Sequence, residues 1–170
     1  MELTEKRPRK DMQENPENSS APKMEAVCEN KMESLQRVIR EMNAFMKSRD
    51  VAPPLAYAIR LATEELGTNI IEHGYEDQDT HRIGITLDLS MPATLTLMDD
   101  GKKFNPLTDA PALDLDGAIE ERPIGGLGLR MIQSMGMTLK YRREHDRNRI
   151  QVTFPEPGPD DRPPRTVRSP

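Results

Sequence analysis

The apolar residues of this chain follow two different periods, and the order of these periods restricts the fold more than any other feature. Between residues 31 and 74 they recur every three or four positions, as in two consecutive amphipathic helices. From residue 83 onward they alternate, which is typical of strands with one buried face. Helices therefore do not alternate strictly with strands. We expect an α+β, two-layer sandwich with helices on one face of a mostly antiparallel mixed sheet.

Several residues mark the expected ends of the two helices. Asn30 followed by Glu33 resembles a helix N-cap with a reciprocal acid. Pro53 can open the second helix, because the first-turn N–H groups have no helical partner. Gly74 is a good C-terminal stop. Gly67 is locally unfavourable inside this helix, so it indicates either close packing or the close approach of a ligand.

The remaining segments give strands and one long connection. Residues 23–28 read as a short edge strand, and residues 90–93 connect two alternating segments in a hairpin. Residues 137–143 and 149–154 read as a terminal hairpin. Between the hairpins, residues 102–123 contain three prolines and mixed polarity. A connection of this length in a small domain is usually a functional loop or lid.

Composition divides the chain into one domain and two tails. Residues 1–22 and 155–170 are nearly free of large apolar groups and rich in proline, polar residues and charge. Such segments bury too little surface to offset chain entropy, so both tails are expected to be disordered. Residues 23–154 are long enough for a single hydrophobic core.

Charge, cysteine content and hydropathy exclude several classes of protein. The net charge of −5 argues against direct nucleic-acid binding. Cys28 is the single cysteine, so neither an internal disulfide framework nor a cysteine-rich zinc site can form. No apolar stretch approaches membrane-spanning length, and the charged N-terminus does not resemble a signal peptide. We expect a cytoplasmic protein that does not associate with membranes.

A polar stripe on the second helix is the first candidate site. Glu65, Asn69 and His73 are spaced by four residues, which places them on one helix face beside the apolar stripe. A carboxylate there can accept a proton, and an amide oxygen can coordinate Mg²⁺. The alternative is an ordinary solvated helix face.

Two further segments contain groups that can bind a ligand. Asp99 precedes Gly101 at a strand end, where a carboxylate can bind an amino group and glycine allows a ring to approach; a simple strand-ending turn is the alternative. Residues 125–128 contain three glycines before a helix, and N–H groups there can bind phosphate. Neither a P-loop lysine nor a preceding strand is present, so this is not a Walker or Rossmann loop. A flexible hinge is the alternative.

Taken together, the three segments resemble the N, G1 and G2 boxes of the histidine-kinase-like (GHKL) ATPases. The resemblance covers residues 24–154. It is carried by Glu-Glu-Leu-Gly-Thr-Asn-Ile-Ile-Glu-His-Gly-Tyr, Asp-Asp-Gly-Lys-Lys-Phe-Asn-Pro and Gly-Gly-Leu-Gly-Leu. These phrases are most similar to those of the bacterial anti-sigma serine-protein kinases of the RsbW type. The resemblance implies a Bergerat ATP-binding fold with ATP and Mg²⁺ as cofactors.

The resemblance also assigns roles to individual residues. It implies that Glu65 is the general base, that Asn69 holds Mg²⁺, and that Asp99, with Gly101 beside it, binds the adenine amino group. Thr153 on the last strand is expected to support adenine recognition. The phosphates are expected to meet Gly126, Gly128, Leu129 and Arg130.

The function implied by the resemblance is a serine/threonine-protein kinase that phosphorylates a STAS-class antagonist and sequesters a sigma factor, as a homodimer. The main alternative is a non-catalytic ATP-dependent binding module in the same kind of partner-switching pathway. A histidine-kinase catalytic fragment is disfavoured, because the first helix contains no histidine. A structural domain without nucleotide binding is disfavoured because all three boxes keep their key residues.

Overall fold

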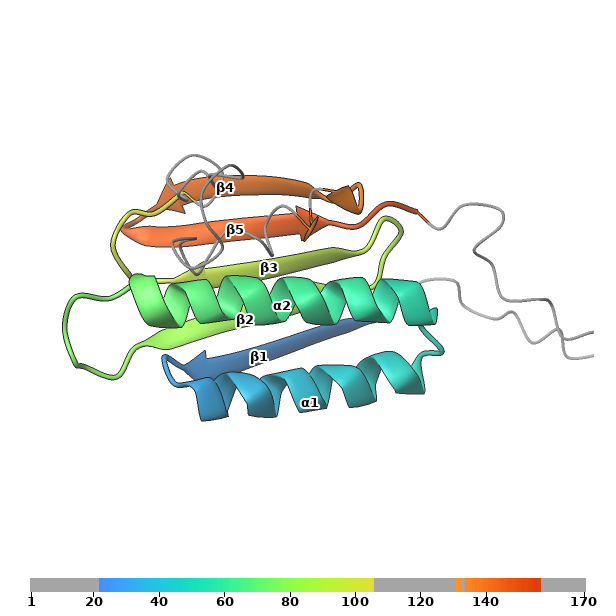
Figure 1. Cartoon of the computed structure of the whole chain (residues 1–170), viewed down its shortest axis with the longest axis horizontal. Coiled ribbons are helices and arrows are strands. Elements are labelled where there is room, and N and C mark those ends of the chain that lie inside the picture. The colour runs from blue at the N-terminus through green and yellow to red at the C-terminus, as the bar shows by residue number, and fades with distance from the viewer. Residues whose placement is uncertain (1–21, 106–130, 133, 157–170) are drawn as a thin grey trace, which may run out of the picture.

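The computed structural model describes residues 22–105, 131–132 and 134–156, which form one sheet and two long helices (Figure 1). The helices lie on one face of the sheet, which confirms the two-layer α+β prediction. Neither helix is long and apolar enough to cross a membrane. The elements are β1 (Lys23–Glu29), α1 (Met32–Ser48), α2 (Pro53–His73), β2 (Arg82–Asp88), β3 (Thr94–Asp99), β4 (Thr138–Glu144) and β5 (Arg147–Thr153).

The strand order is β1-β2-β3-β5-β4, and every pairing among the described strands is antiparallel. The parallel pair implied by a mixed sheet is therefore not present in this part of the chain. The connection between β1 and β2 explains the direction of that pair. One crossover helix returns a chain parallel to its first strand, whereas two helices in succession bring it back antiparallel.

The core lies between the sheet and the two helices. Successive strand residues point to opposite faces of a sheet, and here the apolar set of each strand points toward the helices. The side chains buried to 6% exposure or less include Leu35, Val38, Met42 and Met46 of α1, Ile59, Ala62, Leu66 and Ile70 of α2, and Ile83, Ile85, Leu87, Leu95, Leu97, Ile150 and Val152 of the sheet.

Gly67 lets the two helices approach each other closely. A Cβ atom at this position would lie 2.7 Å and 2.8 Å from the two terminal carbons of Leu35, which is fully buried. Of the two roles that the sequence allowed for Gly67, the structure therefore supports helix packing.

The start of α1 differs from the sequence-based expectation. Lys31 occupies the N-cap position and makes no side-chain capping bond, so the predicted Asn30 cap is wrong. Instead, the Asn30 side chain donates to the carbonyl of Asp79 at 3.1 Å and accepts from the N–H of His81 at 3.0 Å. Asn30 therefore fixes the loop that precedes β2. Both partners are distant from Asn30 in sequence, which is why the local pattern could not reveal them.

The packing at Gly67 predicts an energetic coupling with Leu35. We expect Leu35→Ala alone to lower the free energy of unfolding by about 2–5 kcal/mol, because it leaves a cavity. Gly67→Ala should be less favourable in the wild type than in the Leu35→Ala background, by about 1 kcal/mol, because the added methyl meets Leu35 only in the former. Urea denaturation of the wild type, the two single variants and the double variant measures this difference. Equal effects of Gly67→Ala in both backgrounds would contradict close packing at this position.

Candidate functional site

The C-terminal end of α2 contacts the turn that follows β3, and this contact organises the candidate site (Figure 1). The N–H of Lys102 donates to the carbonyl oxygen of Gly74 at 2.8 Å. A Cβ atom on Gly101 would lie 2.5 Å from that same oxygen. Only glycine fits at position 101 without moving the backbone. The helix ends at His73, so Gly74 lies at the predicted stop, but its φ of −79° is right-handed and not the left-handed value typical of a glycine stop.

Asp99 is a buried carboxylate at the end of β3, with only 3% of its surface exposed. Its Oδ1 atom accepts hydrogen bonds from the Gly101 N–H at 2.9 Å and from Asn148 Nδ2 at 2.8 Å. Among the described residues, none donates to Oδ2. Burial raises the pKa of Asp99, and the two hydrogen bonds partly oppose that rise. Asp99 can therefore offer one oxygen to an incoming donor.

Asn148 on β5 is the central residue of a network around Asp99. Its Oδ1 accepts from the Tyr141 hydroxyl and from Arg143 Nη1, both at 2.9 Å. Its Nδ2 donates to Asp99 and also to the carbonyl of Lys102 at 2.9 Å. Sequence reasoning missed Asn148, because only the pairing of β3 with β5 brings it opposite Asp99.

Thr153 does not lie beside Asp99. In the β3–β5 register Asp99 pairs with Asn148, whereas Thr153 pairs with Thr94 at the other end of the strands. The five intervening steps along β5 amount to about 17 Å at the usual rise of a strand. The geometry therefore assigns the place next to the carboxylate to Asn148 and does not fit the expected role of Thr153.

The polar stripe of α2 is graded in exposure. Glu65 and Asn69 are half-buried, whereas His73 is exposed and lies 3.8 Å from Glu72. Burial raises the pKa of Glu65, and the neighbouring charge of Glu64 adds to the rise. Asn69 is five residues before Gly74, or about 7.5 Å along the helix axis. The stripe therefore approaches the turn that contains Gly101.

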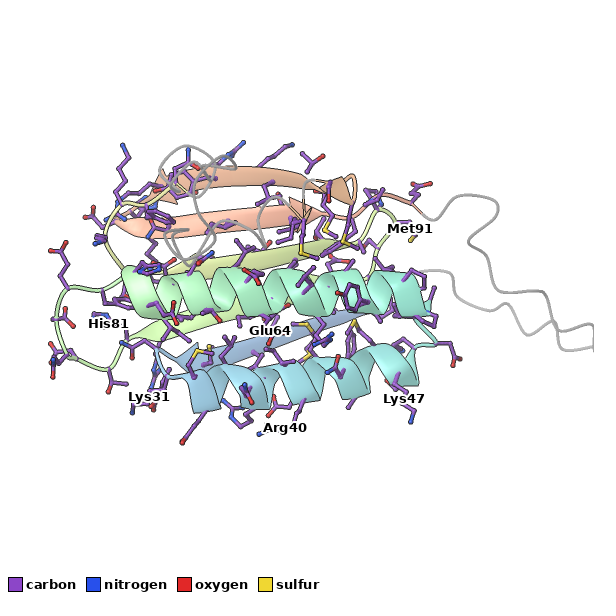
Figure 2. The ribbon with its side chains drawn as sticks, in the orientation of Figure 1. Lys31, Arg40, Lys47, Glu64, His81 and Met91 are labelled. Atoms are coloured by element: carbon purple, nitrogen blue, oxygen red, sulfur yellow. The ribbon has the colours of Figure 1, made fainter. Side chains whose placement is uncertain are left out.

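The loop between α2 and β2 packs beside the same turn. The rings of Tyr75 and His81 stack with centroids 4.1 Å apart. His81 contacts Asp77 through Nε2 at 2.8 Å and Asp100 through Nδ1 at 3.2 Å. Figure 2 shows His81 at the same end of the molecule as the C-terminus of α2. These contacts join the loop to Asp100, the residue after Asp99. The turn is therefore held by this loop as well as by the end of α2.

A cavity of about 490 Å³ opens beside Asp99 on the opposite face of the sheet. Its floor includes Val27, Gly84 and Met98, which are neighbours in the strand register. They alternate with the core residues of their strands, so their side of the sheet faces away from the helices. This cavity is therefore separate from the side that carries Glu65 and Asn69.

The expected phosphate-binding residues cannot be placed in this site. Gly126, Gly128, Leu129 and Arg130 lie outside the described residues. Of the candidates that are described, the structure brings Asp99 and Gly101 together in the turn, with Glu65 and Asn69 on the helix that ends there.

The buried charge of Asp99 gives a pH-dependent stability. Because its pKa is raised above the ordinary value of 3.8, the folded state binds more protons than the unfolded chain, and the contribution of Asp99 to stability falls as pH rises through the folded pKa. Asp99→Asn removes this titration and keeps an oxygen to accept the two hydrogen bonds. We expect the stability of this variant relative to wild type to increase as pH rises above about 4.

Urea denaturation at a series of pH values measures this dependence. Asp50→Asn is a matched control, because Asp50 is exposed and has a positive φ of 50° that asparagine tolerates. A stability difference between Asp99→Asn and wild type that stays constant with pH would show that Asp99 is not destabilised by burial.

Comparisons with a protein-family model and with solved structures both give matches. The family model of the histidine kinase-like ATPase domain matches residues 28–154. One similar solved structure is the histidine kinase domain of the Erythrobacter litoralis EL346 blue-light activated histidine kinase, with 18% identity and a TM-score of 0.42. That match covers 72% of this chain and 59% of the other. No significant match occurs among curated proteins.

The family match begins at the end of β1 and ends at the residue after β5, so it includes both helices, the Asp99 turn and Asn148. The chain belongs to the histidine kinase-like ATPase domain family.

Proposed function

We propose that this chain is an ATP-binding serine/threonine-protein kinase of the anti-sigma type. It transfers the γ-phosphoryl group of ATP to a hydroxyl group on a STAS-class antagonist, and it sequesters a sigma factor. Membership of the ATPase family supports nucleotide binding. The observation that carries the proposal is the buried Asp99 carboxylate near the end of α2, whose Oδ2 accepts no hydrogen bond from the described residues, together with the half-buried Glu65 and Asn69 on α2.

The turn after β3 fits the base of a purine nucleotide. Asp99 Oδ2 can accept a hydrogen bond from an exocyclic amino group, while Oδ1 stays bonded to Gly101 and Asn148. Gly101 has no side chain that would fill the space beside the carboxylate. A carboxylate acceptor with one oxygen committed to the protein is suited to a donor such as the 6-amino group of adenine.

Asn69 fits the role of a magnesium ligand. Mg²⁺ prefers hard oxygen ligands, and in nucleotide sites it keeps several waters and phosphate oxygens in its shell. Few protein ligands are needed in such a site. The half-buried amide of Asn69 would supply one oxygen ligand.

Glu65 fits the role of a general base. Bound ATP would supply the γ-phosphoryl group and leave as ADP, and Mg²⁺ would neutralise the charge that develops on transfer. Glu65 would accept the proton of the attacking hydroxyl group. A base acts best when its pKa lies near the working pH, and burial raises the pKa of Glu65 in that direction. The half-buried position of the side chain leaves it accessible to a substrate.

The proposed partners follow from the motif resemblance alone. The similarity of the Glu65–Asn69 helix and the Asp99 turn to those of anti-sigma kinases supports a sigma factor and a STAS-class antagonist as partners. It also supports a homodimer that acts in the cytoplasm. Direct contact with nucleic acid has no part in this proposal.

Removal of the proposed magnesium ligand should weaken Mg-ATP binding. We expect Asn69→Ala to lower the affinity for Mg-ATP at least about tenfold, because the amide oxygen is lost, and to abolish the gain in affinity that Mg²⁺ gives the wild type. Calorimetric titration with and without Mg²⁺ measures both effects. Thr68→Ala is the control, because Thr68 is the adjacent half-buried residue of α2 and lies outside the stripe. Tight, Mg²⁺-dependent binding by Asn69→Ala would remove Asn69 as the ligand.

Removal of the proposed base should separate binding from transfer. We expect Glu65→Gln to bind Mg-ATP like the wild type and to transfer phosphate roughly 10²–10⁴-fold more slowly, because glutamine cannot accept the proton. Wild-type activity should fall as pH drops through the raised pKa of Glu65. The assay follows radiolabelled phosphate from ATP to a STAS-domain protein.

Glu64→Gln is the matched control for this assay, because Glu64 is the exposed neighbour that pairs with Arg60 at 3.4 Å. It should retain transfer activity, with the pH dependence shifted to lower pH because the charge that helps to raise the pKa of Glu65 is removed. An active Glu65→Gln variant would overturn the assignment of the base. Nucleotide binding without transfer to any STAS-domain protein would instead indicate an ATP-dependent binding module.

A further inference from the structure

We propose that Asn148 is a positioning residue that holds the Asp99 carboxylate with one oxygen committed to the protein and the other directed to the nucleotide base. It thereby selects bases that present an amino group. This inference rests on the proposed nucleotide-binding function. It concerns a residue of β5 that is 3% exposed and whose side chain contacts β3, the turn at Gly101 and β4.

The hydrogen-bond partners of Asn148 fix the orientation of its amide. An arginine side chain has only donors, so the atom of Asn148 that contacts Arg143 must be the oxygen. The amide nitrogen then faces the Asp99 carboxylate and the Lys102 carbonyl, both of which are acceptors at these contacts. A flipped amide would place like groups together on both sides. The network therefore allows a single orientation of the side chain.

The same network holds the backbone of the turn. Asn148 binds the carbonyl of Lys102, and Arg143 Nη1 binds the carbonyl of Gly101 at 3.0 Å while it also binds Asn148. The turn is thereby tied to the β4–β5 hairpin on one side. On the other side the Lys102 N–H is bonded to the end of α2. The position of Asp99 relative to α2 thus depends on Asn148 and Arg143.

This arrangement has a consequence for the choice of base. Oδ1 of Asp99 already accepts two hydrogen bonds, so an exchange of its two oxygens by rotation would break and remake both. Oδ2 remains an acceptor of defined direction. A base with an amino group at that point forms a hydrogen bond, whereas one with a carbonyl group places two acceptors against each other. Loss of the Asn148 donor would let the carboxylate rotate and weaken this distinction.

The first test uses the protein without nucleotide. Asn148→Leu keeps a similar volume and removes the donor to Asp99, so we expect carboxyl ¹³C NMR to show a higher pKa for Asp99 in this variant. Gln151→Leu is the matched control, because Gln151 is an amide on the same strand whose side chain alternates to the other face. An Asp99 pKa equal to that of the wild type in Asn148→Leu would overturn the proposal.

The second test compares ATP with inosine triphosphate, in which a carbonyl group replaces the 6-amino group. We expect Asn148→Leu to bind ATP about tenfold more weakly and inosine triphosphate as the wild type does, so that the preference for ATP falls about tenfold. A purely structural role would weaken both nucleotides equally, and that result would contradict the proposal. Gln151→Leu should leave both affinities unchanged.

A milder variant covers the case in which Asn148→Leu does not fold. Arg143→Met keeps Asn148 but removes the donor that orients its amide, and the Arg143 side chain is one-quarter exposed. We expect smaller changes in the same directions, and an unchanged preference and an unchanged Asp99 pKa would overturn the proposal. Wild-type protein that binds no ATP would refute the proposed function, whereas the Asp99 titration would still decide the positioning role of Asn148.

Discussion

The contact between the end of α2 and the turn after β3 is the constraint on which the rest of the site depends. Gly74 and Lys102 join the two elements by a backbone hydrogen bond of 2.8 Å, and the absence of a side chain at Gly101 allows it. Through this contact, the helix that carries Glu65 and Asn69 and the strand that ends in Asp99 meet at one end of the sheet. A side chain at position 101 would force the two elements apart.

The burial of Asp99 at the end of β3 creates a conflict between stability and function. Burial of Asp99 disfavours its charged form, yet the charged form is the better acceptor for a base. The fold reduces the conflict with hydrogen bonds from Gly101 and Asn148, both to the same oxygen. The arrangement lowers the cost of the buried charge and leaves the second oxygen available. Asn148 on β5 in turn accepts hydrogen bonds from Tyr141 and Arg143 on β4. Both strands therefore take part in stabilising the buried carboxylate.

Features that depend on neighbours in sequence were predictable, and features that depend on distant partners were not. Helical spacing predicts the polar stripe that contains Glu65 and Asn69, and local composition predicts the turn at Asp99 and Gly101. By contrast, Asn30 binds residues near position 80, and Asn148 binds Asp99 across the sheet. The expected adenine contact at Thr153 failed to fit for the same reason, because its distance from Asp99 is set by strand register.

The sequence by itself therefore determined the two-layer α+β class, both long helices and the candidate residues on α2 and in the Asp99 turn, because hydrophobic period and turn chemistry are local properties of a chain. Only the tertiary structure decided that Gly67 serves helix packing and that Asn148 stands beside Asp99. Both depend on which surfaces meet. That choice is made by the packing of the whole core and by the register of β3 with β5, which no short segment of sequence contains.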